Sequence, residues 1–513
     1  MGNRRLLPAI VFFGVVALAA CNSTTRSGKG LAVGHLASSP SDTAGGAAGT
    51  ITGLSPSGGS ATAPGGSGSP GSGGAVGGTG VGANAGGPFA GVGGAGSSPA
   101  TVPSTGGPLP RLTGYGGVTD KVITLGIQYA KLNAAFVALG VQGSAGDPKA
   151  AFDAVIQYVN QRGGIAGRQV RVVYYATDVA NANSYAADAQ AACAMFTEDN
   201  TVFAAVVSAG IAGGSGPCVA QRKRLVVEAG DSDVYDQTLF AQRAPFVYQP
   251  SGISGSRLGF WVDDLVVRGF LTKTSRIGVV RYDQPVWERI TSGAVVPALS
   301  RHGLTPTDQA ILSLPQSTAD LSRTAGDAQS AILRFRTEGI DRVLFVYGAG
   351  AAEFVWMPEA ENQGYRPRYA ITSHDLPEFL VQNVPAAQLH GAAGAGWIPS
   401  SDLPRDPGGR PAADQCSAIL RAAGISSADA IGVGDSACEP IFFLKTVVER
   451  STELSPAGFR AAVDGVGAAF SSPLTLGTLY GPGRYDGGST FRDLVFDGSC
   501  GCFQYSGPPR QSG

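Results

Sequence analysis

The chain has 513 residues, and its 37 basic and 38 acidic side chains leave a formal net charge of −1. Lys and Arg form no block along the sequence, which argues against a nucleic-acid partner. Only four histidines are present, with no HExxH pattern or His/Cys cluster at metal-ligand spacing, so we expect neither a metal nor another cofactor.

The first residues have the pattern of an export signal. Arg4 and Arg5 give a positive start, and the apolar run Leu6–Leu18 is shorter than the ~20 residues of a membrane-spanning helix. The run LAAC that ends at Cys21 resembles the lipobox of bacterial lipoproteins, which implies cleavage before Cys21 and a diacylglycerol anchor on it. An ordinary signal peptide with an incidental cysteine is the alternative. We therefore expect residues 1–20 to be removed and the exported chain to be held at the cell membrane.

Residues 21–116 are mostly Gly, Ser, Ala, Thr and Pro. Such a segment buries too little apolar surface to offset the entropy of ordering it, so we predict a disordered tether. A flexible coil of this length has an end-to-end distance of roughly 50–60 Å. Residues 91–96 match the GxGxxG expression, but no strand precedes them and no helix follows, so we reject a dinucleotide site.

The folded part opens with a strand–helix–strand unit. Val122–Ile127 is a short β-branched run typical of a buried strand. Asp147 and Pro148 supply an N-cap and a first helical residue, and Gly163-Gly164 ends the apolar-striped helix. Val170–Tyr175 is the second strand, which predicts a right-handed crossover.

The stretch GDPKAAFDAVIQYVNQRGGIAGRQVRVVYYATD in this unit resembles the type I periplasmic-binding-protein family. Within that family it resembles the branch of leucine/isoleucine/valine-binding proteins of ABC importers. The resemblance extends from Gly117 to about Tyr505. It implies an α/β fold with two doubly wound parallel-sheet lobes joined by a hinge that the chain crosses three times. The expected ranges are 117–249 and 398–481 for lobe 1, and 250–397 and 482–513 for lobe 2.

Helices and strands alternate through both lobes, as a doubly wound sheet requires. In lobe 1 we expect a helix at Ser184–Phe196, a strand at Val202–Val207, a short helix at Cys218–Arg222 and a strand at Leu225–Glu228. In lobe 2 we expect helices at Ser254–Leu271, Val286–His302, Thr324–Thr337 and Ala351–Asn362, and strands at Ile277–Arg281, Ala310–Leu312, Arg342–Tyr347 and Tyr369–Thr372. Phe491–Tyr505 is a terminal β-segment.

Six cysteines remain if Cys21 carries lipid, and they allow fifteen pairings. Pairing neighbours in sequence is the most economical choice, and the family often has a bridge in the region of the first pair. In Cys500-Gly501-Cys502 a single residue separates the two cysteines, which makes a disulfide between them a strained ring. A redox or metal-binding pair is the alternative to such a local disulfide. The predicted disulfides are Cys193–Cys218, Cys416–Cys438 and Cys500–Cys502.

Ligands of open α/β sheets bind at the carboxyl ends of the strands, and the family resemblance places the cleft there. Relatives that bind branched-chain amino acids hold the ligand carboxylate with lobe-1 hydroxyls, and the ammonium group with a lobe-2 acid. Here those positions fall on Gly210, Asp231 and Ser373, with Asp375 two residues further. An aspartate beside a ligand carboxylate would be repulsive, so a leucine-like ligand is not favoured.

Asp231, Asp283 and Asp375 suit a cationic or hydroxyl-rich ligand, although each is also a common cap or turn residue. Tyr282 and Trp287 provide either a stacking wall or hinge-side packing. The adjacent His374 and Asp375 have no accompanying nucleophile, so we predict no enzyme activity. The candidate ligand-binding residues are Tyr129, Ser208, Ala209, Gly210, Asp231, Ser232, Tyr282, Asp283, Trp287, Gly348, Ser373, His374 and Asp375.

These features predict a lipid-anchored, extracytoplasmic solute-binding protein. We expect a monomer that closes its lobes on a small polar ligand (an amino acid, amide, polyamine or similar molecule) and presents it to an ABC permease. The alternative is a ligand sensor or cell-envelope interaction protein that uses the same fold without transport. The long tether and the missing amino-acid anchors leave that alternative open.

Overall fold

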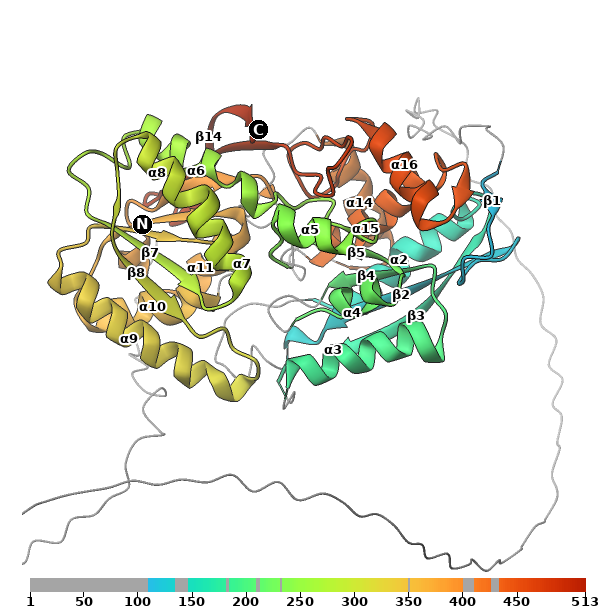
Figure 1. Cartoon of the computed structure of the whole chain (residues 1–513), viewed down its shortest axis with the longest axis horizontal. Coiled ribbons are helices and arrows are strands. Elements are labelled where there is room, and N and C mark those ends of the chain that lie inside the picture. The colour runs from blue at the N-terminus through green and yellow to red at the C-terminus, as the bar shows by residue number, and fades with distance from the viewer. Residues whose placement is uncertain are drawn as a thin grey trace, which may run out of the picture. The chain divides into compact units, whose positions relative to one another are not determined.

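The computed structural model describes residues 109–133, 146–180, 184–208, 213–230, 233–348, 351–399, 410–425 and 433–513 (Figure 1). The predicted signal peptide and Cys21 lie outside these ranges, so lipid attachment stays a prediction. Within the described ranges, no helix combines the length and the apolar character needed to cross a membrane.

The predicted tether extends too far toward the C-terminus. Arg111–Leu112 is strand β1, which pairs in parallel with β12 (Glu453–Leu454). The Tyr115 ring packs edge-on against Phe203 at 5.6 Å between centroids. These residues are therefore part of the fold, because Tyr115 supplies a large apolar ring that packs on the core of lobe 1.

Lobe 1 is built on a five-stranded parallel sheet in the order β3-β2-β4-β5-β6. Its strands are β2 (Val122–Ala130), β3 (Gln169–Thr177), β4 (Ala204–Ser208), β5 (Leu225–Glu228) and β6 (Val247–Tyr248). Helices cover both faces: α2 (Pro148–Gln161), α14 (Pro411–Ala422), α15 (Val433–Val448) and α16 (Pro456–Val466) on one, and α3 (Tyr185–Ala194), α4 (Gly216–Gln221) and α5 (Gln237–Arg243) on the other.

Helix α2 follows the sequence prediction closely. The Asp147 side chain accepts a hydrogen bond from the N–H of Ala150 at 3.0 Å, and Pro148 is the first helical residue. Gly163 and Gly164 have φ values of +91° and +74°, a backbone conformation that glycine adopts without a Cβ penalty. The local signals were therefore sufficient to define both ends of this helix.

Lobe 2 contains a seven-stranded sheet in the order β14-β13-β11-β10-β9-β7-β8. Five strands run parallel: β7 (Ile277–Tyr282), β8 (Pro306–Leu312), β9 (Arg342–Phe345), β10 (Arg368–Thr372) and β11 (Ala393–Gly396). The terminal β-segment is an antiparallel hairpin of β13 (Thr490–Asp497) and β14 (Cys502–Gln511), which pairs with β11 through β13.

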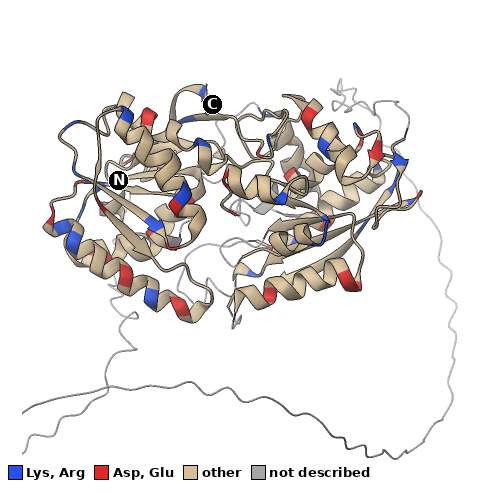
Figure 2. Ribbon diagram, in the orientation of Figure 1, with Lys and Arg blue, Asp and Glu red and all other residues tan. Residues whose placement is uncertain are grey.

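The helices of lobe 2 pack on the apolar faces of this sheet. They are α6 (Gly259–Val267), α7 (Pro285–Ile290), α8 (Val296–Arg301), α9 (Leu321–Thr337), α10 (Ala351–Asn362), α11 (Pro377–Asn383) and α12 (Ala386–Leu389). On α9, basic and acidic positions alternate along the ribbon, in keeping with its solvent-facing side (Figure 2).

The prediction of one helix from Val286 to His302 was too simple. A π-helical turn, Thr291–Val295, separates α7 from α8. Pro297 lies in the first turn of α8 and has no N–H to donate to a carbonyl in the preceding turn. We attribute the wider π turn to this missing donor.

The three segments predicted to cross between the lobes lie side by side. Gln249 donates its N–H to the Tyr485 carbonyl, and the N–H of Gly487 returns to the Gln249 carbonyl, both at 2.9 Å. The N–H of Leu476 donates to the Trp397 carbonyl at 2.9 Å. A cluster of close backbone pairings thus forms the hinge, whereas the exact lobe boundaries stay a prediction.

All six described cysteines are paired as neighbours in sequence. Cys193–Cys218 joins α3 to α4, and Cys416–Cys438 joins α14 to α15, each with a Cα–Cα distance of 6.0 Å. Cys500–Cys502 closes across the tip of the β13–β14 hairpin.

Candidate functional site

The carboxyl ends of the strands carry a polar cluster in lobe 1. Gln128 in β2 is fully buried; its Nε2 donates to Thr177 Oγ1 at 3.0 Å, and its Oε1 accepts the N–H of Ser215 at 2.8 Å. The Ser215 hydroxyl is also buried and has no hydrogen-bond partner among the described residues. Neither was among the candidate ligand-binding residues, although the segment from Gln128 onward was expected to approach the cleft and the turn that contains Ser215 was considered as a holder of an anionic group.

A group of acids lies beside this cluster. Glu228, the last residue of β5, is fully buried, and its Oε1 accepts the Tyr235 hydroxyl at 2.8 Å. Burial, followed by the negative charge of Asp233, raises the pKa of Glu228 well above its usual value. Burial likewise raises the pKa of Asp233 to about 6. Burial therefore favours the neutral, protonated form of Glu228, in which its carboxyl group can donate a hydrogen bond.

Two glycines let the backbone approach these acids. A Cβ on Gly216 would lie 2.4 Å from Glu228 Oε1, closer than real Cβ atoms come. A Cβ on Gly214 would meet the Val207 side chain at 2.4 Å. The backbone of the Gly-rich turn that begins α4 thus lies against the ends of β4 and β5.

In lobe 2, Asp375 ties two strand ends together. Its Oδ2 accepts the Thr372 N–H at 2.6 Å, and its Oδ1 accepts the Gly348 N–H at 2.8 Å. The residue is fully buried, and burial raises its pKa to about 6 although these hydrogen bonds oppose the shift. The structure thus gives Asp375 the capping role that was one of its two predicted alternatives.

A second buried acid pairs with Asp375. Glu353, in the first turn of α10, is fully buried and interacts with the Asp375 side chain. Burial and mutual repulsion disfavour the state in which both carboxyl groups of such a pair are ionised. A Cβ on Gly348 would lie only 2.1 Å from Glu353 Oε1, which explains the glycine after β9. Sequence reasoning did not single out Glu353.

The remaining lobe-2 candidates form a buried layer around this pair. The Trp287 indole donates to the Tyr347 carbonyl at 3.0 Å, and its ring meets Tyr282 edge-on at 5.4 Å. The His374 ring packs on Tyr347 at 4.8 Å between centroids. Burial lowers the pKa of His374 to about 4, so its imidazole is neutral near neutral pH. Neither of its nitrogens has a hydrogen-bond partner in the described part of the chain.

Comparison with known proteins matches residues 139–488 to the model of the family described as periplasmic binding protein. The chain belongs to this family. No curated protein matches the sequence significantly. Three solved structures are similar to this chain in fold. A solute-binding protein of an ABC transporter from Rhodopseudomonas palustris BisB5 in complex with 3,4-dihydroxybenzoic acid has a TM-score of 0.54 and 11% identity, and the match covers 76% of this chain and 98% of that one. For a branched-chain amino acid ABC transporter protein from Thermus thermophilus with bound valine, the TM-score is 0.55, the identity 15%, and the coverages 77% and 97%. For a fatty acid ABC transporter substrate-binding protein from Thermomonospora curvata, the TM-score is 0.55, the identity 16%, and the coverages 78% and 94%.

In this periplasmic binding protein, four predicted site residues lie outside the described ranges: Ala209, Gly210, Asp231 and Ser232. Ser208 is half-buried at the end of β4. Ser373 is buried, and its Oγ accepts the N–H groups of Trp397 at 2.6 Å and Ile398 at 3.1 Å. Ser373 therefore links the end of β10 to a hinge crossing.

Two predicted residues lie apart from the buried clusters. Tyr129 faces α2 and contacts Tyr174 edge-on at 6.1 Å, whereas its neighbour Gln128 points to the opposite face of the sheet. Asp283 is exposed, and its Oδ1 accepts the N–H of Leu314 at 3.1 Å. Asp283 thus joins the turns that follow β7 and β8, which matches its predicted alternative as a turn residue.

The loops after β3 and β8 bridge the two lobes of this binding protein. The Thr318 hydroxyl donates to the Val179 carbonyl at 2.9 Å, and the Tyr185 N–H donates to the Gln316 carbonyl at 3.0 Å. We call this pair of hydrogen bonds the interlobe bridge. It joins loops that both follow carboxyl ends of strands, the edge at which a ligand is expected.

Proposed function

We propose that this chain is a lipid-anchored, extracytoplasmic solute-binding protein that closes its two lobes on a small polar ligand and delivers it to an ABC importer. The observation that supports this most directly is the hinge, in which the third crossing hydrogen-bonds to each of the other two. Hinges of this kind allow rigid lobes to close around a ligand. Membership of the periplasmic binding protein family supports the same assignment.

The chemistry at the strand ends favours an uncharged or cationic ligand. Gln128 and Ser215 offer neutral hydrogen-bonding groups in lobe 1. Burial raises the pKa of Glu228 and of Asp375, and a positive ligand group would stabilise the ionised form of either acid. An anionic group would instead meet acids in a site of low dielectric constant, which is unfavourable. Amides, amines and polyamines therefore fit better than a simple carboxylate.

The solved relatives bind different classes of molecule, namely an aromatic acid, valine and, by its name, fatty acid. The fold alone does not choose among them. The ligand of this chain has to be identified from the side chains at its own strand ends, including Asp231.

The test is a thermal-shift screen of the full-length protein with amino acids, amides, polyamines and sugars, together with native mass spectrometry of any co-purified molecule. A ligand that binds only the folded state at 100 times its Kd stabilises it by about 2.7 kcal/mol, so a clear rise in melting temperature is expected. A screen and a mass spectrum that both show no ligand would count against a transport role and favour the alternative of an interaction protein.

With a ligand in hand, we expect Asp231→Ala to weaken binding at least tenfold, which corresponds to about 1.4 kcal/mol. Isothermal titration calorimetry measures this directly. Asp199→Ala is the matched control, since Asp199 is exposed at the end of the helical segment that follows α3. Equal affinities of the two variants and the unmodified chain would remove Asp231 from the site.

A further inference from the structure

The tip of the β13–β14 hairpin carries a disulfide that differs from the other two in exposure. Cys500 is exposed and Cys502 is half-buried. Cys416 and Cys438 are both 0% exposed, and in the remaining disulfide Cys193 is 1% exposed while Cys218 is half-buried. Exchange with an external thiol requires that a thiolate reach one sulfur in line with the bond. Of the three described disulfides, Cys500–Cys502 is thus the one with an exposed cysteine.

Contacts other than this disulfide hold the hairpin together. Asp497 pairs with Cys502, and Phe496 with Phe503, in the ladder that joins β13 to β14. The turn is also closed by a hydrogen bond from the Gly501 N–H to the Asp497 carbonyl at 2.9 Å. Since a disulfide stabilises a fold less when it closes a shorter loop, a bridge over one residue adds little to this framework.

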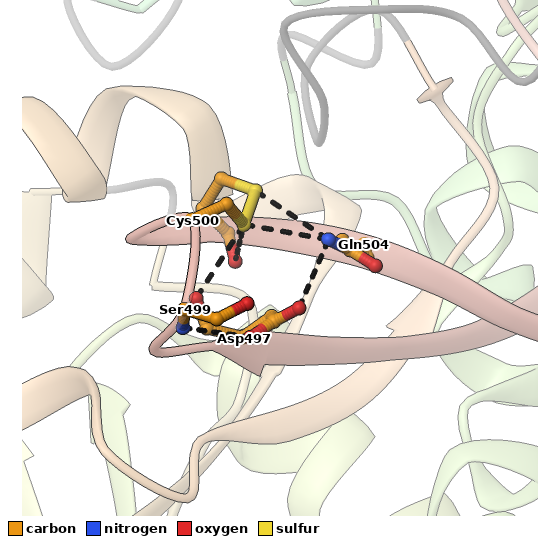
Figure 3. The surroundings of a disulfide bond; sticks show 5 residues. Asp497, Ser499, Cys500 and Gln504 are labelled. Carbon is orange, nitrogen blue, oxygen red and sulfur yellow. Dashed lines mark hydrogen bonds between the residues drawn. A yellow bond between two sulfur atoms is a disulfide. The ribbon is translucent and has the colours of Figure 1, made fainter.

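The side chain of Gln504 faces both sulfurs. Its Nε2 lies 3.4 Å from Cys500 Sγ and 3.8 Å from Cys502 Sγ, and it also donates to Asp497 Oδ2 at 3.1 Å (Figure 3). The Asp497 contact orients the amide toward the sulfur pair. An N–H directed at sulfur favours the thiolate over the thiol, so Gln504 would help either cysteine to leave as a thiolate.

We propose that Cys500–Cys502 is a thiol–disulfide exchange site, with Gln504 as its positioning residue. An external thiolate attacks one sulfur, a new S–S bond forms to the attacking sulfur, and the Cys500–Cys502 bond breaks. The electron pair leaves on the other cysteine, which then takes a proton from water. A second external thiolate releases the first as a disulfide. In total, two thiols are oxidised to one disulfide, and the protein pair gains two electrons and two protons.

The site is independent of the proposed ligand function. It lies on a hairpin tip, and its cysteines contact none of the predicted ligand residues in any described interaction. A failure of the ligand screen would leave this proposal untouched, and the converse also holds.

The test equilibrates the full-length protein with a series of reduced and oxidised glutathione mixtures at pH 7.5. Acid quenching, alkylation with N-ethylmaleimide and peptide mass spectrometry then give the reduced fraction of each pair. We expect Cys500–Cys502 to be half-reduced in a buffer at least tenfold less reducing than the other two disulfides require. Circular dichroism should show nearly the same melting temperature for the protein in which only this pair is reduced.

Gln504→Leu tests the positioning role. The pH dependence of alkylation of the reduced pair should shift to higher pH, and the rate of reduction by glutathione should fall about threefold or more. Gln511→Leu on the same hairpin is the control, because Gln511 contacts Thr490 and neither sulfur. The exchange site is refuted if Cys500–Cys502 is reduced together with or after the other two disulfides. The role of Gln504 is refuted if its variant behaves like the Gln511 control.

Discussion

Glu228 shows how a single buried acid makes folding depend on pH. It is fully buried at the end of β5, and burial raises its pKa far above the ordinary value of 4.5. Because the folded state holds this proton more tightly than the unfolded state, the contribution of Glu228 is most favourable below pH 4.5. It is lost progressively as pH rises toward the folded-state pKa.

Replacing this acid with its amide should therefore stabilise the protein at neutral pH. Glu228→Gln retains an oxygen that can accept the Tyr235 hydroxyl, and it removes a buried acid whose ionisation Asp233 opposes. We expect a melting temperature about 2 °C or more above that of the unmodified chain at pH 7.5, with a smaller difference at pH 5. Differential scanning calorimetry at several pH values measures it.

Glu288→Gln on α7 is the matched control, since Glu288 is exposed. It should leave the melting temperature nearly unchanged at both pH values. A destabilised Glu228→Gln variant at pH 7.5 would mean that the carboxylate form is needed, contrary to the raised pKa.

The residues of the site were only partly predictable from sequence. Asp283 and Asp375 were recognised because acids after a strand are conspicuous, and both turned out to accept backbone N–H groups. Glu353 was missed because its importance depends on α10 and β10 meeting in space. The partner of Gln128 was not predictable, because a strand pattern indicates which face a residue occupies and nothing about a contact 87 residues away.

At the scale of elements, the sequence was most informative where local signals agree. The bounds of β5 and α10 match the prediction residue for residue, and α2 begins at the predicted proline. The helix predicted at Val286–His302 is interrupted by a π turn. The apolar pattern could not indicate this turn, because a hydrogen bond lost at one proline leaves the pattern unchanged. No elements were predicted between residues 400 and 479, where α14, α15 and α16 complete lobe 1.

The disulfide between α14 and α15 should be a major support of lobe 1. Cys416 and Cys438 are both fully buried in the core beside α2, and 22 positions separate them in sequence. For a loop of this length the chain-entropy model gives about 3 kcal/mol. We therefore expect the double variant C416S/C438S to lose roughly that much stability in urea unfolding.

The matched control is C500S/C502S, whose bridge spans 2 positions at an exposed hairpin tip. The same model gives roughly 1.2 kcal/mol for so short a loop, so a clearly smaller loss of stability is expected. Equal losses for the two double variants would show that loop length and burial do not govern these disulfides.

At the scale of the whole molecule, the interlobe bridge joins the two lobes through hydrogen bonds between segments that are not hinge crossings. The Thr318 hydroxyl and the Val179 carbonyl belong to loops of different lobes. A hydrogen bond of this kind contributes about 1 kcal/mol, which changes the ratio of bridged to open molecules about fivefold. The bridge is thus strong enough to bias closure and weak enough to open.

Thr318→Val should shift this balance toward the open form, since valine keeps the shape and removes the donor. We expect a larger radius of gyration in small-angle X-ray scattering of the ligand-free variant. Thr337→Val is the control, because the Thr337 hydroxyl donates within α9 to Leu333. An unchanged scattering curve for Thr318→Val, or an equal change in the control, would contradict a role for the bridge in closure.

The pairing of β11 with β13 has a consequence for how the protein folds. Gly396 is paired with Arg492, and the intervening chain builds three helices of lobe 1. Loop-closure entropy for a connection of roughly a hundred residues opposes this pairing until the connection is itself compact. The sheet of lobe 2 therefore cannot be completed until β13 has been synthesised, and compaction of the inserted helices favours its pairing with β11. A chain with this order of assembly remains incomplete while it is synthesised from its N-terminus, a state compatible with translocation before folding.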